Sequence, residues 1–396
     1  MLRNSLRRLS SVVTLRARPP PNTAVTSACF TITNDAPPSP LEPHQLRCTT
    51  LLLSVDPFLR CRFNADPGVA YTSAYEIDAP IASAGLGVVT ETTAEGFEPG
   101  DLVLEPFDAW PWADEVVLDA SRVARVPRAL PLLLPPSSLL GVVGQVGLTA
   151  YCGLHHHCAA PPADGDVLVV SGAAGAVGSA VGQLARRSGA AVVGICGTDA
   201  KADALLDLGF SSVVNYRSEA LAADLDAALD GREVTHYFDN VGGDLSDLVI
   251  SRMRAEGTVI LCGQIASYDS DVPYPPPLPS ATADLVRERR ISRERYLVLD
   301  HKAHFAAALA EVAALVAGGE LRTPETRYAG GAGGAADAFV SMMGGGNLGK
   351  ALVEGAAAPP AWVRAAEAAR SALPPRWRER LCRKYVTAEA LAAFVS

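Results

Sequence analysis

The sequence predicts a two-unit α/β protein, in which a β-rich unit is joined to a doubly wound unit built on a parallel sheet. Its 396 residues exceed the length of a typical single domain, which is about 100 to 200 residues. Short apolar runs broken by Pro, Gly and Asp fill residues 13–135. From Gly165 onward, strand-like runs alternate with amphipathic helical stretches. These patterns predict one β-rich unit followed by one of alternating strands and helices.

The β-rich unit is predicted over residues 13–135. Segments such as LLLSVDPF, GLGVVTE and PGDLVLEPF show little helical periodicity. A basic arm, residues 1–12, precedes this unit and contains Arg and Ser but no acid. Its composition fits an organellar transit peptide and an unstructured arm about equally. We therefore expect a cytoplasmic protein, or an organellar one if the arm is a targeting signal.

The parallel-sheet unit is predicted over residues 136–320. Its strands are DVLVVS, AVVGICG, SVVNY, HYFDNVGG, TVILCG and YLVL, with a helix expected to continue to about Ala255 before TVILCG. Six strands are the number in a complete dinucleotide-binding Rossmann fold. Residues 321–356 are expected to return to the first unit. Residues 357–396 are expected to form an appended extension with one or two amphipathic helices, which either dock on an acidic surface or pack on their own subunit.

A glycine-rich turn, residues 172–178, follows the first of these strands. The stripe Val177, Val181, Leu184 and Ala185 predicts a helix directly after it. Gly175 would let the backbone approach a pyrophosphate, and Gly178 would let the helix pack closely on the strand. The free N–H groups and the dipole of the helix would face the anion. The turn therefore predicts a dinucleotide site.

The tip of the second strand indicates which dinucleotide binds. An NAD site usually has an acid there, whereas this strand ends in the residues ICGT, followed by Lys201. An ammonium group at this position would pair with a 2′-phosphate, which favours NADPH. Asp199 leaves NAD open, because a slightly longer strand would put it in the acid's place. Lys201 can also be interpreted as a solvated residue of the next helix.

The cysteines and histidines do not predict a metal site. The eight cysteines are never spaced as CxxC, and none lies between Cys61 and Cys152. Cys196 and Cys262 lie in apolar runs and are interpreted as buried structural thiols. The sequence HHHC at residues 155–158 is the one metal-like cluster, and it lacks a second set of ligands.

Charge and hydropathy limit the partners. The net charge is −9, and outside the basic residues 1–18 and 361–396 the chain holds 22 basic and 40 acidic residues. Such a surface repels phosphate backbones, so no nucleic acid partner is predicted. No apolar run reaches the roughly 18 to 20 residues that a membrane-spanning helix needs. A monomer or homodimer acting on a small molecule is expected.

Several longer phrases resemble the zinc-independent branch of the medium-chain dehydrogenase/reductase family, and within it the type 2 prostaglandin reductases, the 15-oxoprostaglandin 13-reductases. They are LSVDPFLRCRFN, VVSGAAGAVGS, VVGICGT, YFDNVGG, ILCGQIASY, DVPYPPPL, ISRERYLVL and GGNLGK. The resemblance extends from about residue 13 to residue 355. It implies a GroES-like catalytic domain, a Rossmann domain, and NADPH-dependent reduction of the carbon-carbon double bond of α,β-unsaturated ketones such as 15-oxoprostaglandins or related oxylipins.

The resemblance also implies site residues. NADPH would be held by Ala173, Ala174, Gly175, Ala176, Lys201, Tyr216, Asn240, Cys262, Gly263, Gln264, Ile265, Ala266, Ser267, Tyr268, Tyr296, Leu297, Val298 and Asn347. The substrate would lie near Tyr71, Phe107, Asp108, Ala109, Trp110 and Tyr268. Tyr268 follows the strand TVILCG at the carboxyl end of the sheet, so we expect it to be the catalytic hydroxyl that stabilises an enolate.

Two features depart from the family pattern. The segment EPFDAWPW is two residues longer than the family's usual turn, and the extension after Ala356 has no family counterpart. Because of these two departures, the sequence does not identify the substrate. Two other functions also remain open on the sequence: a quinone oxidoreductase and a non-catalytic NADPH-binding protein. The run Pro275, Pro276 and Pro277 is interpreted as a rigid spacer or a gate beside the cofactor strand.

Overall fold

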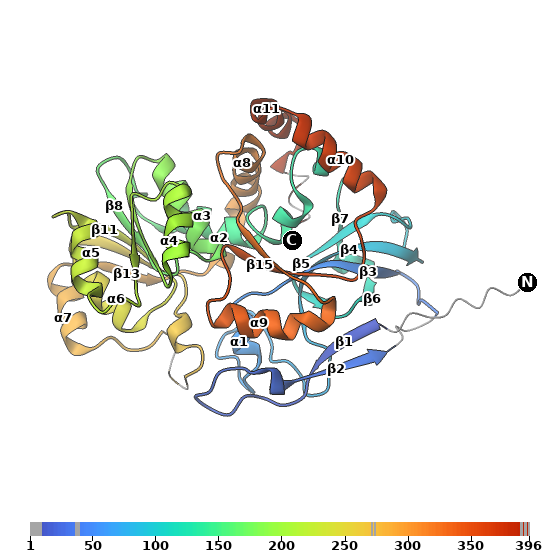
Figure 1. The fold of residues 1–396 in the computed structure, drawn as a ribbon, viewed down its shortest axis with the longest axis horizontal. Helices are drawn as coiled ribbons and strands as arrows, with labels where there is room; N and C mark the ends of the chain where they lie inside the picture. The colour runs from blue at the N-terminus through green and yellow to red at the C-terminus, as the bar shows by residue number, and fades with distance from the viewer. Residues whose placement is uncertain are drawn as a thin grey trace, which may run out of the picture.

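The structure is a computed structural model that describes residues 10–35, 40–270, 272, 275–388, 391 and 394. Residues 1–9 of the expected basic arm therefore lie outside the described residues, as do parts of the DVPYPPPLP loop and of the extension. Figure 1 shows the parallel sheet and its helices on the left and the β-rich unit on the right. Within the described part of the chain, no helix is both long and apolar enough to span a membrane.

The parallel sheet confirms the doubly wound prediction. Its strands run in the order β10 (Ser212–Asn215), β9 (Ala191–Cys196), β8 (Val167–Val170), β11 (Val234–Asp239), β12 (Met253–Leu261) and β13 (Ser292–Arg295). All five pairings are parallel. The strand order reverses between β8 and β11, and ligands of such sheets bind outside the carboxyl ends of the strands at this switch point.

Both faces of this sheet are buried. The sequence of β8 is continuously apolar because its side chains enter a core on each face. Val167 and Val169 contribute to one core with α5 (Leu221–Leu229), α6 (Gly243–Ile250) and α7 (Ser280–Glu288). Leu168 and Val170 contribute to the opposite core with α3 (Ala176–Arg187) and α4 (Asp199–Asp207). Alternate side chains of one strand thus hold helices on the two faces.

The β-rich unit is built on a second, mixed sheet. Its strands run in the order β14 (Glu325–Tyr328), β15 (Lys350–Glu354), β3 (Gln45–Ser54), β4 (Ala82–Thr92), β5 (Leu102–Pro111) and β7 (Ala124–Arg125), and β6 (Glu115–Asp119) also pairs with β3. A separate antiparallel pair joins β1 (Ser10–Leu15) to β2 (Phe30–Asp35). The chain returns to this sheet through β14 and β15, with α9 (Ala335–Met343) between them.

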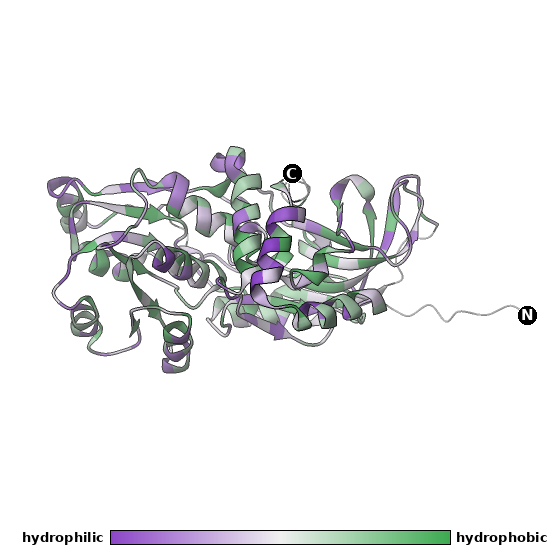
Figure 2. Cartoon of the chain, turned by 90° about the horizontal axis from the view of Figure 1, so that it is seen from above, coloured by the Kyte–Doolittle hydropathy of each residue, from purple (hydrophilic) through white to green (hydrophobic). Residues whose placement is uncertain are grey.

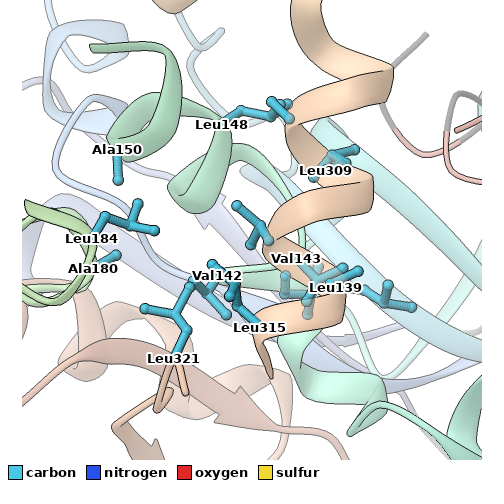
Figure 3. Close-up of a cluster of buried hydrophobic side chains, with 14 of the residues drawn as sticks. Leu139, Val142, Val143, Leu148, Ala150, Ala180, Leu184, Leu309, Leu315 and Leu321 are labelled. Atoms are coloured by element: carbon cyan, nitrogen blue, oxygen red, sulfur yellow. The ribbon is translucent and has the colours of Figure 1, made fainter. Parts of the chain in front are cut away.

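The two units meet on a shared apolar core. It is formed by α3, α2 (Gln145–Cys152), α8 (Phe305–Gly318) and the short helix η4 (Pro136–Leu140). Figure 3 shows Leu184 of α3 and Leu148 of α2 directed toward the space between these helices, with Leu309 and Leu315 on α8. This packing fixes the position of the glycine-rich turn relative to the β-rich unit.

The C-terminal extension packs on its own chain. It forms α10 (Ala361–Ala372) and α11 (Pro375–Tyr385), and α11 lies along α8 (Figure 1). Cys382 and Phe394 are buried in the shared core, and the Nε1 of Trp362 donates to the carbonyl oxygen of Gly100 at 3.0 Å. Figure 2, seen from above, shows hydrophilic and hydrophobic residues alternating on these helices, as expected for amphipathic packing.

Three local predictions are wrong. The helix expected to reach Ala255 ends at Ile250, because Met253 is fully buried and already pairs with β11. The strand expected at YLVL lies at Ser292–Arg295, because the chain turns into a 3-10 helix from Val298. The EPFDAWPW segment is a bulged part of β5 rather than a turn, and it places residues 106–109 opposite the single residue Ala84.

Candidate active site

The glycine-rich turn joins β8 to the start of α3. Gly172 has a φ of 59°, which favours glycine, and a Cβ on Gly178 would lie 2.5 Å from the carbonyl oxygen of Gly172. The backbone N–H of Gly349 donates to the carbonyl oxygen of Ala174 at 2.7 Å. The turn thus presents Ala173, Ala174, Gly175 and Ala176 at the N-terminus of a 12-residue helix, where backbone donors and the helix dipole suit a pyrophosphate.

Lys201 lies in the first turn of α4, beside the tip of β9. Its side chain donates to the carbonyl oxygen of Gly345 at 2.6 Å, and burial lowers its pKa. The charge of Arg217 lowers the same pKa further, so two cations lie near one another. The carboxylate of Asp199 accepts a 2.9 Å hydrogen bond from the Asn215 side chain. This arrangement of two cations suits a 2′-phosphate. Asp199, the acid that left NAD open as a cofactor, is hydrogen-bonded to Asn215.

Tyr216 completes this end of the site. Its ring lies against the backbone of Gly197, where an added Cβ would be 2.7 Å from Cε1. The side chain is 44% exposed, and the guanidinium of Arg217 lies 5.6 Å from its ring centre. An exposed ring beside the Arg217 cation is a suitable surface for an adenine base.

The carboxyl end of β11 is organised by Asp239, which sequence reasoning missed. This carboxylate is fully buried and accepts hydrogen bonds from the hydroxyls of Ser171, Tyr237 and Ser246 and from two backbone N–H groups. Asn240 follows it, and its side chain donates to the carbonyl oxygen of Ser171 at 2.8 Å. Asn240 is therefore held against the glycine-rich turn.

The predicted cofactor segment after β12 lies beside Asn240. The N–H groups of Cys262 and Gly263 both donate to the carbonyl oxygen of Asp239, and the 3-10 helix Ile265–Ser267 begins with a bond from Ile265 to Asn240. Gln264 is buried, and its side chain lies over Gly242. Burial raises the pKa of the Cys262 thiol to about 12, which disfavours the reactive thiolate form. Ala266 and Ser267 continue the same turn.

Tyr268 lies at the end of that turn and folds back over the strand tip. A Cβ added to Gly263 would be 3.0 Å from the Tyr268 hydroxyl oxygen. The hydroxyl thus lies at the carboxyl ends of β11 and β12, where the sequence places it. Its catalytic role remains a prediction.

In the two other predicted cofactor segments, the described side chains mainly contact the protein itself. Tyr296 is buried, and its hydroxyl donates to the carbonyl oxygen of Thr149 at 2.9 Å, so its side chain is part of the core. Val298 is also buried, and Leu297 between them is half-buried. On the return segment, the side chain of Asn347 donates to the carbonyl oxygen of Gly349 at 2.7 Å, which holds that loop in shape.

The predicted substrate residues form a second group, in the β-rich unit. Asp108 accepts hydrogen bonds from Arg62 at 3.0 Å and from Thr72 at 3.1 Å, and Thr72 follows Tyr71, which is 39% exposed. The carboxylate of Glu105 accepts from the N–H groups of Phe107 and Ala109. These bonds shape the β5 bulge and connect it to the Tyr71 loop.

Trp110 does not fit the predicted substrate contact. Its side chain is fully buried in the core of the β-rich unit, and its Nε1 donates to the Thr50 hydroxyl at 2.9 Å. The close approach of the indole explains why Gly85 and Gly87 have no side chains. A substrate cannot reach this ring while the core is packed, so Trp110 is a structural residue.

The two groups of predicted residues are connected by one short helix, α1 (Leu59–Arg62). Arg62 binds Asp108 in the substrate group, and Arg60 forms a 2.5 Å ion pair with Asp269, next to Tyr268. Sequence reasoning missed both arginines, although the phrase LSVDPFLRCRFN contains them. Alternate residues of α1 thus connect the β-rich unit to the cofactor unit at the candidate site.

No metal site was found within the described ranges: no three or more His, Cys, Asp or Glu side chains there are grouped to hold an ion. His155, His156 and His157 lie in a π-helical turn after α2. The ring of His156 stacks on His304 with centres 3.9 Å apart, and His157 meets His301 edge-on. Parallel stacked rings direct their nitrogens side by side rather than toward one ion.

Comparison with known proteins places these features in a family. Residues 13–126 match the family model described as "N-terminal domain of oxidoreductase", and residues 176–313 match "Zinc-binding dehydrogenase". Prostaglandin reductase 1 of Rattus norvegicus is 34% identical over 80% of this chain and 91% of its own, and that of Oryctolagus cuniculus is 35% identical over 80% and 85%.

A solved structure supports the same family assignment. CurA of Vibrio vulnificus in complex with NADPH is 28% identical, with a TM-score of 0.76 over 88% of this chain and 100% of its own. The mixed and parallel sheets thus correspond to a GroES-like domain and a Rossmann domain. The chain belongs to the medium-chain dehydrogenase/reductase family.

Proposed function

We propose that this protein is an NADPH-dependent reductase of the carbon-carbon double bond of α,β-unsaturated ketones. The observation that carries the proposal is the position of the Tyr268 hydroxyl over Gly263, at the carboxyl ends of β11 and β12. A hydroxyl donor at this place suits a reaction that develops negative charge on a carbonyl oxygen. The relatives named prostaglandin reductase 1 support the same class of substrate.

The donor set fits NADPH. The glycine-rich turn offers backbone N–H groups to the pyrophosphate, and Lys201 and Arg217 offer positive charge to the 2′-phosphate. We propose that Asn240, Gly263 and Val298 would hold the nicotinamide end when NADPH binds. The NADPH complex of CurA supports this choice of cofactor.

The chemistry divides between the cofactor and the protein. When bound, NADPH supplies a hydride to the β-carbon of the enone. The protein orients the enone between the β5 bulge and the turn at residues 262–268, and it stabilises the enolate oxygen through the Tyr268 hydroxyl. Neither role requires a metal, so we propose that the enzyme is zinc-independent. The α-carbon of the enolate then takes a proton from water, which gives the saturated ketone.

A 15-oxoprostaglandin or a related oxylipin is the proposed type of substrate, on the resemblance to type 2 prostaglandin reductases. A quinone oxidoreductase is the second candidate, because it shares the fold and cofactor. Steady-state oxidation of NADPH with a 15-oxoprostaglandin, a simple enone and a quinone separates them. The proposal expects turnover of the two enones to exceed that of the quinone at matched concentration. Turnover of the quinone alone would reject enone reduction, and no turnover of any would favour a non-catalytic protein.

A further inference from the structure

One ion pair joins the two units at the candidate active site. The Nε of Arg60, on α1 of the β-rich unit, lies 2.5 Å from the Oδ1 of Asp269, beyond the end of β12. The two residues are 209 positions apart in the sequence. Asp269 directly follows Tyr268, so the ion pair lies at the end of the segment that carries the candidate catalytic hydroxyl.

The guanidinium of Arg60 is a fixed point within the β-rich unit. Its Nη1 donates to the Oδ1 of Asn64 at 2.9 Å, and its Nη2 donates to the carbonyl oxygen of Thr23 at 3.0 Å. The Arg60 side chain is 3% exposed, whereas that of Asp269 is 39% exposed. A planar guanidinium that is held at two other nitrogens has little freedom, so the aspartate is the partner that the ion pair restrains.

The start of the turn at residues 262–268 is held by the other unit. The N–H of Ile265 donates to the carbonyl oxygen of Asn240 at 3.2 Å, and the N–H of Ala266 donates to that of Val241 at 3.0 Å. Both acceptors directly follow β11 of the parallel sheet. Tyr268 therefore lies between one anchor on the cofactor unit and one anchor on the β-rich unit.

The second arginine of α1 holds the other side of the proposed substrate site. Arg62 donates to the carboxylate of Asp108, in the β5 bulge, at 3.0 Å. Its guanidinium also donates to the carbonyl oxygen of Ser73, and its Cζ lies 4.1 Å from the ring centre of Tyr75. One short helix thus holds both the bulge and the end of the Tyr268 segment, and the enone is proposed to bind between them.

Stabilising an enolate requires an accurately placed donor. The donor must lie about 2.7 to 3.1 Å from the oxygen on which negative charge develops. A misplacement of about 1 Å can lower a rate by about 100-fold. We infer that Arg60 is a positioning residue: by holding Asp269, it places the Tyr268 hydroxyl in register with a substrate bound on the β-rich unit. This role rests on the proposed enone reduction, and Arg60 acts in it through Tyr268.

The test is a double-mutant cycle on the single-turnover rate with a simple enone, at saturating NADPH. Asp269→Ala is the first change, because replacing Arg60 would also leave Asn64 and Thr23 without their donor. We expect Asp269→Ala to lower the rate by about 10-fold and to leave the affinity for NADPH unchanged. Asp269→Asn keeps an acceptor oxygen for Arg60, so it should retain more of the rate.

The second change in the cycle is Tyr268→Phe. When the hydroxyl is already absent, the ion pair has no donor to place, so adding Asp269→Ala should lower the rate by less than about 2-fold. An ion pair that served only to stabilise the fold would lower the rate by the same factor with or without Tyr268→Phe. That equal loss would overturn the inference, and so would a wild-type rate in Asp269→Ala.

Asp226→Ala is the matched control. Asp226 of α5 forms a 2.6 Å ion pair with Arg252, which precedes β12 and so lies at the opposite edge of the parallel sheet from the candidate site. This variant also removes an aspartate from an Arg–Asp ion pair, and it should leave the single-turnover rate unchanged. A loss equal to that of Asp269→Ala would show that the effect is not specific to the Tyr268 segment and would overturn the inference.

Failure of the proposed function gives a different result. If the wild type turns over no enone, enone reduction fails, and amide hydrogen exchange of residues 262–268 then tests whether the ion pair restrains this segment. Asp269→Ala should speed the exchange of these residues, whereas Asp226→Ala should not. Unchanged exchange in Asp269→Ala would show that Arg60 does not hold the segment.

Discussion

The Nζ of Lys201 donates a 2.6 Å hydrogen bond to the carbonyl oxygen of Gly345, which joins the cofactor unit to the return segment of the β-rich unit. The same segment donates from Gly349 to Ala174 in the glycine-rich turn. One loop therefore supports both the lysine proposed for the 2′-phosphate and the turn proposed for the pyrophosphate. The proposed cofactor site is thus shaped partly by residues far away in the sequence, since Lys201 and Gly345 are 144 positions apart.

Replacing Lys201 by Ala should weaken NADPH more than NADH. A charge-assisted hydrogen bond to the 2′-phosphate is worth about 1 to 3 kcal/mol, and NADH has no phosphate at this position. Dissociation constants for both cofactors, measured by fluorescence titration, test this. Equal weakening of the two cofactors would show that Lys201 acts only by holding the Gly345 loop.

Arg217→Ala should weaken NADPH binding less than Lys201→Ala does. It should also weaken the binding of NADPH more than that of NADH. Arg217 is near enough to lower the pKa of Lys201, but it is exposed. Lys302→Ala is the matched control, since Lys302 is an exposed cation in the 3-10 helix Val298–His304 that precedes α8. An Arg217→Ala variant that binds both cofactors like the wild type would remove Arg217 from the site.

Glu105→Gln should make the protein less sensitive to pH. Burial raises the pKa of the Glu105 carboxyl to about 7, well above its value of about 4.3 in an unfolded chain. The stability that the neutral carboxyl provides is complete below about pH 4.3 and is lost as pH rises through about 7. Glutamine stays neutral and still accepts from Phe107 and Ala109. We expect the free energy of unfolding of the variant, relative to wild type, to be about 1 to 3 kcal/mol higher at pH 8 than at pH 5.

Urea denaturation at the two pH values measures this difference. Glu76→Gln is the control, because Glu76 is exposed. Its stability relative to wild type should be the same at both pH values. A Glu105→Gln variant that behaves like this control would show that the carboxyl is ionised in the folded protein at pH 5.

The sequence predicts the doubly wound sheet and the site regions because those features depend on local patterns. The apolar run at β8, the glycines after it and Lys201 lie within about 35 residues of one another. Trp110 and Arg62 could not be assigned in this way. Whether a tryptophan lines a cleft or fills a core depends on strands β3 and β4, and the role of Arg62 depends on Asp108, 46 residues later.

The extension was expected to be a docking tail or a helix packed on its own subunit, and the structure shows the second. Arg383 forms ion pairs with Glu311 of α8 and Glu379 of α11. An amphipathic pattern alone cannot show which surface the apolar side contacts, because that surface is formed by α8, about 70 residues earlier.

Removing residues 361–396 should therefore destabilise the protein rather than leave it unchanged. A narrower change isolates the cause: Phe394→Ala should lower stability by about 3 to 5 kcal/mol, because the ring is buried against the shared core. Trp377→Ala is the control, since that side chain is 48% exposed, and it should change stability by less than about 0.5 kcal/mol. Thermal unfolding of both variants tests this prediction. If Phe394→Ala and Trp377→Ala had the same melting temperature, the extension would not be part of the core.

Tyr268→Phe should lower turnover and leave the affinity for NADPH nearly unchanged. The change keeps the ring beside Gly263 and removes only the hydroxyl. Loss of one donor to a developing oxyanion costs at most about 100-fold to 1,000-fold, and we expect less because the cofactor ribose and Tyr71 can share the role. Single-turnover kinetics separates chemistry from product release. A wild-type rate would remove Tyr268 from the mechanism.

The most direct test of enone reduction uses NADPH that carries deuterium at the transferable position of its nicotinamide ring. The protein, treated with a chelator, is incubated with a 15-oxoprostaglandin, and the product is examined by NMR. We expect a saturated ketone with deuterium on the carbon β to the carbonyl. Deuterium on the carbonyl carbon, in an allylic alcohol, would mean that the enzyme is a carbonyl reductase and would rule out enone reduction.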